Sequence, residues 1–279
     1  MMNGMAAERA PKKPIRNNGA AYRTDRFPPP YTAVEHPVAG RFMTTVEKHS
    51  VGAYHVFLLH GGGCAAEALP RHADIIRTIV SKGFRVTAFA YPLFPEHDLM
   101  EIHEAVYEAW RLLCELYPED QFALFGDSAG GALGLNLEMR LRDEGDPRRP
   151  MKTVFVSPAL DMSFTNPEID KYKDIDISVN FYSAKMLGER LAGDRDLKGV
   201  FISPIYGDHH DLGEILMFYG GKEFLRPDCE RFAEKIAHTP GTEIRAYRAA
   251  KRYHDHLLWV NYPESVDAFE KIAAFLSEA

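Results

Sequence analysis

The stretch Gly126-Asp127-Ser128-Ala129-Gly130-Gly131 decides the fold, because it joins a short apolar run to an amphipathic helical pattern. The preceding run, Gln121–Phe125, has the compact apolar character of a buried parallel strand. After the glycines, leucines recur every four residues up to Leu141, which predicts a helix. A strand, a sharp glycine-rich turn and a helix in this order are typical of a nucleophile elbow, whose strained backbone exposes a serine hydroxyl. We therefore predict that Ser128 is a nucleophile.

Apolar runs of the same kind recur on both sides of this stretch. The predicted strands are His55–Leu59, Arg85–Ala90, Gln121–Phe125, Thr153–Val156, Glu214–Tyr219 and Glu243–Tyr247. Between the second and third, apolar residues from Leu99 to Leu113 recur at three- and four-residue spacing and predict a covering helix. Buried strands that alternate with amphipathic helices predict the α/β class, with a mostly parallel central sheet flanked by helices.

The length of 279 residues fits one large α/β domain. Residues 1–35 are rich in Pro, Asn, Lys and Arg and predict an N-terminal arm, flexible or draped over the body, so that residues 36–279 form the domain. The interval 162–212 is longer than a simple crossover and has a helical portion near Ser183–Leu191. It predicts a small cap-like insertion over the C-terminal edge of the sheet, either the wall of a site or ordinary surface elaboration.

Composition excludes several classes of protein. A formal net charge of −7 argues against a nucleic-acid partner, because such binding needs a basic surface. The three cysteines, Cys64, Cys114 and Cys229, are too few for a disulfide framework and indicate free thiols in a reducing compartment, by default the cytoplasm. The first 20 residues lack the apolar stretch of a secretory signal, and no run is apolar for long enough to span a bilayer.

A second glycine-rich loop, His60-Gly61-Gly62-Gly63, follows the first predicted strand. Its bare backbone presents amide protons to a developing negative charge, as an oxyanion hole does. We predict that Gly61 or Gly62, together with the amide of Ala129, holds the oxyanion. A phosphate cradle is the alternative, but the loop lacks the Lys-Ser/Thr pair of a P-loop and the G-x-G-x-x-G pattern.

A serine nucleophile needs a base, and imidazole suits that task near neutral pH. In α/β folds that carry a nucleophile elbow, the order along the chain is serine, then acid, then histidine. His254, after the last predicted strand, is the predicted base, and His256 is the fallback. Glu223, after the preceding predicted strand, is the predicted acid, and Asp228 is the fallback.

Metal binding is the alternative use of these histidines. The pair His254 and His256, or the run Asp208-His209-His210-Asp211, would be the ligands. Neither has convergent partners or the helical H-E-x-x-H spacing of a strong site. We therefore expect no metal and no other cofactor.

The HGGG loop and the GDSAGG elbow together resemble the hormone-sensitive-lipase-like branch of α/β hydrolases. The likeness covers roughly residues 55–275 and includes Tyr91–His97, similar to the family's Y-R-L-A-P-E-H, and Ser157–Asp161. In that family the acid stands in a D-P-L segment, which is similar to Glu223-Phe224-Leu225. The base stands in a Gly-Met-x-His segment, and the residues before His254 depart from that pattern.

This resemblance implies an α/β-hydrolase fold and a serine carboxylesterase without a cofactor. It implies that small-molecule esters with short or medium acyl chains are cleaved through an acyl-enzyme on Ser128, and a homodimer follows only by analogy. An amidase, formamidase or peptidase would use the same triad and stays open. A non-catalytic small-molecule receptor also stays open, because the gibberellin receptor is built on this fold.

Overall fold

The computed structural model describes residues 18–49 and 54–278, and an eight-stranded sheet runs through it. The strand order is β1-β2-β4-β3-β5-β6-β7-β8. The strands are β1 Thr32–Val38, β2 Arg41–Glu47, β3 Tyr54–Leu59, β4 Arg85–Ala90, β5 Gln121–Asp127, β6 Lys152–Val156, β7 Gly213–Gly220 and β8 Thr242–Ala249. Strands β3 to β8 pair in parallel with one another. Strand β2 pairs antiparallel with both β1 and β4. The predicted α/β class with a mostly parallel sheet is confirmed.

The hairpin of β1 and β2 is the part of the sheet that the sequence did not predict. Its two-residue turn, Ala39 and Gly40, has positive φ at both positions, as a type I′ turn requires. β1 is an edge strand that contains Pro37 and exposes Val34. A partly exposed edge strand with a proline lacks the buried apolar run that marks the central strands.

The predicted N-terminal arm is only partly described, since residues 1–17 lie outside the described residues. From residue 18 the chain packs on the body through two short 3-10 helices, Ala20–Tyr22 and Thr24–Arg26. Tyr22 is fully buried, and Glu67 accepts the backbone N–H of Gly19 at 3.1 Å. β1 begins inside the predicted arm, so the boundary at residue 35 is wrong, and residues 18–31 are draped over the domain.

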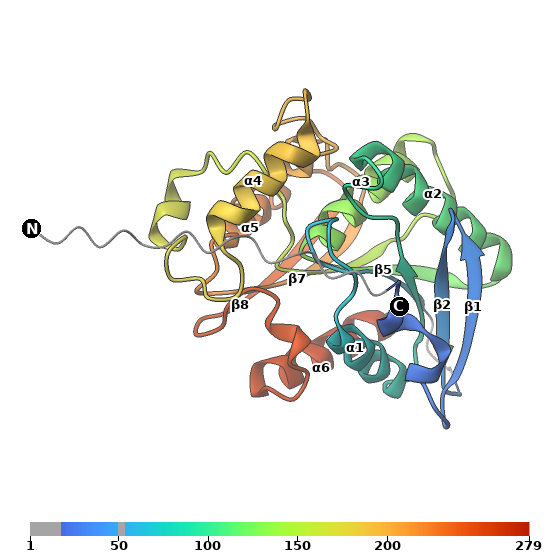
Figure 1. Ribbon diagram of the computed structural model, residues 1–279. Coiled ribbons are helices and arrows are strands. Elements are labelled where there is room, and N and C mark those ends of the chain that lie inside the picture. Colours follow the sequence, from blue (N-terminus) through green and yellow to red (C-terminus); the bar gives the residue numbers. More distant parts are fainter. Residues whose placement is uncertain (1–17, 50–53, 279) are drawn as a thin grey trace, which may run out of the picture.

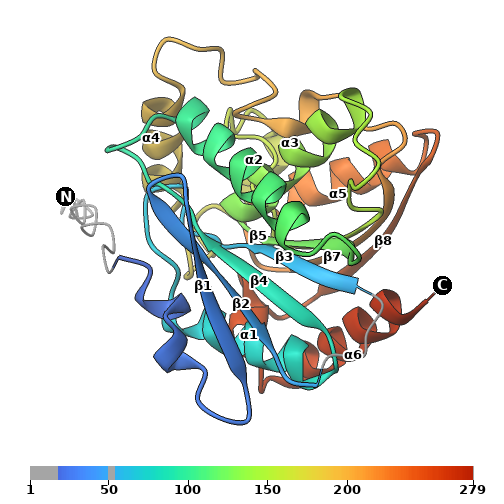
Figure 2. The same ribbon diagram turned by 90° about the vertical axis from the view of Figure 1, so that its right-hand side faces the viewer.

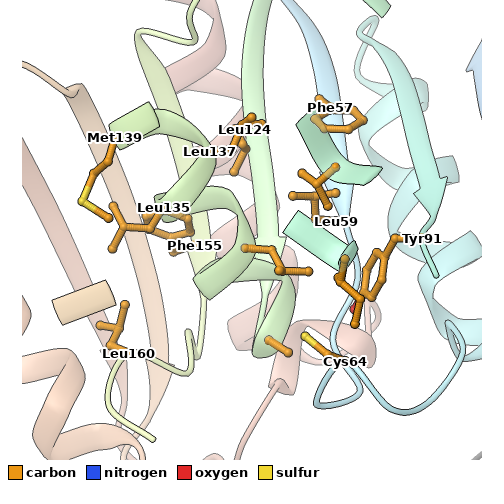
Figure 3. Packing of buried hydrophobic residues seen from close by; sticks show 14 of the residues in the cluster. Phe57, Leu59, Cys64, Tyr91, Leu124, Leu135, Leu137, Met139, Phe155 and Leu160 are labelled. Atoms are coloured by element: carbon orange, nitrogen blue, oxygen red, sulfur yellow. The ribbon is translucent and has the colours of Figure 1, made fainter. Parts of the chain in front are cut away.

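Helices cover both faces of the sheet. They are α1 Pro70–Ser81, α2 Leu99–Leu116, α3 Ala129–Asp143, α4 Phe181–Ala192, α5 Arg226–Ile236 and α6 Pro263–Ser277. Helices α1 and α6 lie on one face, and α2, α3 and α5 on the other (Figures 1 and 2). Each face buries its own apolar core, and Figure 3 shows part of the one beneath α3. Among the described helices, none is both long and apolar enough to cross a membrane.

The carboxyl ends of the parallel strands meet at one edge of the sheet, where ligands bind in open α/β folds. The loop His60–Gly63 follows β3 and Ser128 follows β5. Glu223 follows β7, and His254 follows β8. The topology therefore gathers the predicted site residues at the same edge. Helix α4, from the predicted insertion, lies above it (Figure 1).

Candidate active site

The turn between β5 and α3 is strained at its central residue. Ser128 has φ 50° and ψ −118°, a conformation that residues with a side chain rarely adopt. A Cβ on Gly126 would lie 2.6 Å from the carbonyl oxygen of Gly130, and one on Gly130 would overlap the carbonyl oxygen of Leu59. The Ser128 N–H donates to the Val156 carbonyl at 2.9 Å. The elbow is therefore locked against both neighbouring strands, with its serine projecting above the sheet.

Three of the predicted side chains form a hydrogen-bonded row. Nε2 of His254 lies 3.0 Å from Oγ of Ser128, and its Nδ1 lies 3.1 Å from Oε2 of Glu223. The other oxygen of Glu223 accepts the N–H of Gly220 at 3.1 Å, which fixes the carboxylate. Both Glu223 and His254 are buried. This is the arrangement in which a carboxylate orients an imidazole toward a serine hydroxyl.

The two fallback residues lie apart from this row. Asp228 accepts a hydrogen bond from Nδ2 of Asn166 at 2.9 Å, and burial raises its pKa to about 6. His256 begins a short 3-10 helix, and burial lowers its pKa to about 4. No hydrogen bond within the described residues joins either of them to Ser128 or His254.

The oxyanion loop differs from its prediction at one glycine. The N–H of Gly61 donates to Oδ2 of Asp127 at 2.9 Å, so this amide is already used and cannot also hold an oxyanion. Gly62 and Ala129 line the cavity beside Ser128, as does Gly63, which belongs to the predicted loop but was not among its predicted donors. Asp127 precedes Ser128, and its carboxylate accepts the N–H of Gly61 from beneath the loop. The two residues are far apart in sequence and meet only in the folded chain.

His60 supports the loop from beneath rather than facing the cavity. Its Nδ1 donates to the carbonyl of Gly61 at 2.6 Å, and its ring stacks on Tyr91 at 4.2 Å between centroids. The hydroxyl of Tyr91 donates to the His60 carbonyl at 2.6 Å. Burial, assisted by the neighbouring His72, lowers the pKa of His60 to about 3, so the ring is neutral.

A cavity of about 430 Å³ opens above Ser128 and is mostly apolar. Its walls include residues of α2 and α3, of the oxyanion loop, of the segment after β8, and of the predicted insertion. The insertion contributes Met162, Phe164, Leu187 and Leu191 among others. The insertion is therefore a wall of this cavity rather than unrelated surface elaboration.

Residues 56–258 match a family model described as alpha/beta hydrolase fold. The match spans most of the chain and includes every residue of the hydrogen-bonded row. The chain belongs to the α/β-hydrolase family. The resemblance inferred from the two glycine-rich motifs is thereby confirmed at the level of the family.

Similar α/β hydrolases include curated proteins and solved structures. An esterase of Acinetobacter venetianus is 28% identical over 235 residues, which cover 79% of this chain and 73% of that protein. Esterase LipU of Mycobacterium tuberculosis is 25% identical over 236 residues, covering 80% and 77% respectively. The crystal structure of an esterase from the bacterial hormone-sensitive lipase family has a TM-score of 0.80 and 26% identity, covering 90% of this chain and 85% of that one.

Asp255 adds to this α/β-hydrolase site a carboxylate that was not among the predicted residues. Its Oδ2 lies 3.0 Å from Nε2 of His254, on the nitrogen that also faces Ser128. The residue has left-handed backbone angles, φ 51° and ψ 42°, and its N–H donates to Oγ of Ser157 at 3.2 Å. The sequence shows an acidic residue beside the base, but not that a left-handed turn directs it into the cavity.

The two carboxylates change the proton affinity of His254. Burial alone would favour the neutral ring, but the charges of Asp255 and Glu223 outweigh it, and the pKa of His254 is raised well above its usual value. Burial also raises the pKa of Asp255 to about 6. The imidazole accepts a proton only when it is neutral, so its raised pKa sets the acid limit of any reaction that it catalyses as a base.

Asp255→Asn is expected to move the acid limb of the kcat/KM profile to lower pH. The substitution removes one negative charge beside Nε2, so the pKa of His254 falls and the neutral base persists in more acidic solution. The measurement is ester hydrolysis from pH 4 to 9, with Asp211→Asn, on the exposed turn before β7, as the control. An acid limb that stays in place or moves to higher pH would contradict this electrostatic role.

The predicted metal alternatives have no support in the geometry. His209 is buried, with Nε2 2.8 Å from the Pro204 carbonyl, while His210 pairs with Asp208 on the surface at 2.9 Å. In the part of the chain that the structure describes, no group of three or more His, Cys, Asp or Glu side chains is arranged to hold a metal ion. His254 is engaged with Ser128 and Glu223 instead.

Proposed function

We propose that this α/β hydrolase is a serine carboxylesterase that cleaves short- to medium-chain acyl esters through an acyl-enzyme on Ser128. Curated relatives named above are esterases, and a carboxylic ester hydrolase is the activity that the family match and these relatives support. The observation that carries the proposal is the row of Ser128, His254 and Glu223, joined at 3.0 and 3.1 Å.

The proposed reaction begins with proton transfer from Oγ of Ser128 to Nε2 of His254 as Oγ attacks the ester carbonyl. Glu223 holds the ring through Nδ1 and stabilises the imidazolium. We assign the stabilisation of the oxygen that becomes negative to the amides of Gly62, Gly63 and Ala129, because these residues line the cavity beside Ser128. The imidazolium then protonates the leaving alcohol. Water, deprotonated by the same ring, releases the acid from Ser128.

The substrate class follows from the cavity. Its lining is apolar over most of its surface, which suits a hydrocarbon acyl chain, and its volume of about 430 Å³ limits the ligand to small molecules. Leu187 and Leu191 of α4 close it on the side of the insertion. We therefore expect turnover to fall once the acyl chain exceeds the length that this wall admits.

Active-site labelling tests the proposed function. A fluorophosphonate phosphonylates a serine oxygen, with loss of fluoride, only when a neighbouring base activates that serine, so it should modify one residue per chain, Ser128. Mass spectrometry of a proteolytic digest would locate the label, and hydrolysis of p-nitrophenyl acetate should fall in proportion to labelling. Absence of any hydrolysis combined with tight binding of a small acid would favour the non-catalytic receptor instead. Labelling elsewhere, with ester turnover retained, would refute the role of Ser128.

A further inference from the structure

One imidazole in the cavity wall takes no part in the proposed reaction. His103, on α2, lines the cavity and is 8% exposed. Its Nε2 lies 2.9 Å from the carbonyl oxygen of Phe201, which can only accept a hydrogen bond, so this nitrogen carries the proton. Burial lowers the pKa of His103 to about 4. The ring is therefore neutral near neutral pH, and Nδ1 holds a lone pair.

This lone pair is open to a ligand. Nδ1 of His103 has no hydrogen-bond partner among the described residues. Other nitrogens without a partner there, such as Nε2 of His60 and Nδ1 of His256, are enclosed by the protein, but Nδ1 of His103 is not among them. Because the residue lines the cavity, we infer that a group bound in the cavity can reach this nitrogen. A donor at that place would gain a hydrogen bond in a buried site.

The cavity borders both apolar cores of the molecule, and His103 lies at one end of it. The lining residues Leu99, Leu133 and Leu191 belong to the core beneath α2 and α3. The lining residue Leu258 belongs to the core on the other face of the sheet. His103 follows Leu99 by one turn of α2 and so lies on the same side of that helix. It therefore belongs to the end that α2 and α3 form.

The chemistry of the proposed reaction assigns the acyl group to this end. Nε2 of His254 must come within about 3 Å of the leaving oxygen to protonate it. Leu258 is one turn further along the chain than His254, so the alcohol leaves toward the core that contains Leu258. The acyl chain then extends in the other direction, between α2 and α3.

The depth of His103 sets the length of that acyl chain. The Phe201 carbonyl that binds Nε2 lies 3.5 Å from Nδ2 of Asn136, and this amide also donates to the Ala132 carbonyl at 3.2 Å. Ala132 and Asn136 stand one and two turns after Ser128, a rise of about 6 to 12 Å along α3. Three bonds of an extended chain span about 3.8 Å, so about five to nine bonds cover this distance.

We propose that Nδ1 of His103 accepts a hydrogen bond from a hydroxyl group on the acyl chain, so that the preferred substrates are esters of medium-chain hydroxy acids. The inference rests on the proposed function, since it names the substrate of the same nucleophile. A hydroxyl elsewhere in this apolar end would lose its hydrogen bond to water without replacement. His103 is therefore a specificity-determining residue, and no bond to it forms or breaks in the reaction.

The test compares methyl 6-hydroxyhexanoate with methyl 6-methoxyhexanoate. The two share the ester and the chain, but only the first can donate a hydrogen bond. Acid release in a pH-stat gives kcat/KM for each. The wild type should favour the hydroxy ester by about fivefold, the effect of one hydrogen bond between neutral groups. Both values come from one preparation, so the fraction of active enzyme cancels in their ratio.

Two variants separate the acceptor from the support of the ring. His103→Gln can keep an N–H for the Phe201 carbonyl but places no acceptor at Nδ1, and His103→Leu removes both groups. In each variant the preference for the hydroxy ester should fall by about threefold or more. His36→Gln is the matched control, because His36 also uses Nε2 for a hydrogen bond, to Thr45 in the terminal hairpin. Its preference should equal that of the wild type.

Three results would overturn the inference. The first is equal cleavage of the two esters by the wild type, and the second is a wild-type preference in His103→Gln. The third is a preference that appears only with the hydroxyl on the alcohol, in 6-hydroxyhexyl against 6-methoxyhexyl butyrate. Fluorophosphonate labelling of the same preparations separates the two proposals. Normal labelling at Ser128 with any of these results refutes only the hydroxy-acid preference, whereas loss of labelling in the wild type refutes the proposed function.

Discussion

Ser128→Ala is expected to lower kcat for p-nitrophenyl acetate by about 10⁶-fold, the size of the loss when a serine hydrolase loses its nucleophile. Without Oγ, His254 has no hydroxyl to deprotonate and no acyl-enzyme forms. The amides of Gly62, Gly63 and Ala129 remain, so a residual rate above that of water is expected. Steady-state kinetics together with fluorophosphonate labelling measures both consequences.

The variant should fold as the wild type does. Oγ of Ser128 contacts His254, but the turn itself is held by backbone bonds and by the close approach of Gly130 to β3. Thermal unfolding of the two proteins should therefore agree within a few degrees. A variant with matching stability and a kcat within tenfold of the wild type would exclude Ser128 as the nucleophile.

Glu223→Gln is expected to lower kcat by about 10⁴-fold, the effect of removing the negative charge from the acid of a triad. Glutamine has nearly the same shape, but its amide group can present N–H to Nδ1 and so select the wrong tautomer of His254. It also lacks the charge that stabilises the imidazolium. The measurement is kcat for ester hydrolysis across the neutral and alkaline range.

Asp228→Asn is the matched control for this prediction. Asp228 is as fully buried as Glu223, but it hydrogen-bonds Asn166 on the insertion rather than the base. Its substitution should therefore leave kcat within a few-fold of the wild type. If the asparagine variant lost 10⁴-fold while Glu223→Gln remained active, the assignment of the acid would pass to Asp228.

Strand β8 lies at the edge of the sheet and is mostly exposed, but strands β3 to β7 could be predicted from the sequence because they are buried on both faces. Such strands are compact apolar runs, and all six predicted runs are strands, extended at their ends by one or two residues at most. The hairpin Thr32–Val38 and Arg41–Glu47 could not be predicted in the same way. Its first strand lies at the edge, where only one neighbour and part of one face require apolar side chains.

The hydrogen-bonded arrangement of the candidate site was predictable where it depends on a local motif or on chain order. Ser128 follows from the strand, turn and helix around it, and His254 and Glu223 follow from their places after two consecutive strands. The hydrogen bond that engages Gly61, one of the two predicted glycine donors, could not be predicted, because its acceptor Asp127 is distant in sequence. Asp255 was missed because its direction depends on a left-handed turn anchored to Ser157.

The insertion between β6 and β7 lines the cavity with Met162, Phe164, Leu187 and Leu191, yet it supplies none of the three hydrogen-bonded side chains. Those three side chains lie on the loops that follow β5, β7 and β8, beneath the insertion. The hydrogen-bonded side chains therefore belong to the sheet, whereas part of the cavity wall belongs to the insertion. We expect that sequence changes in this one segment alter the substrate preference and leave the residues of the hydrogen-bonded row in place.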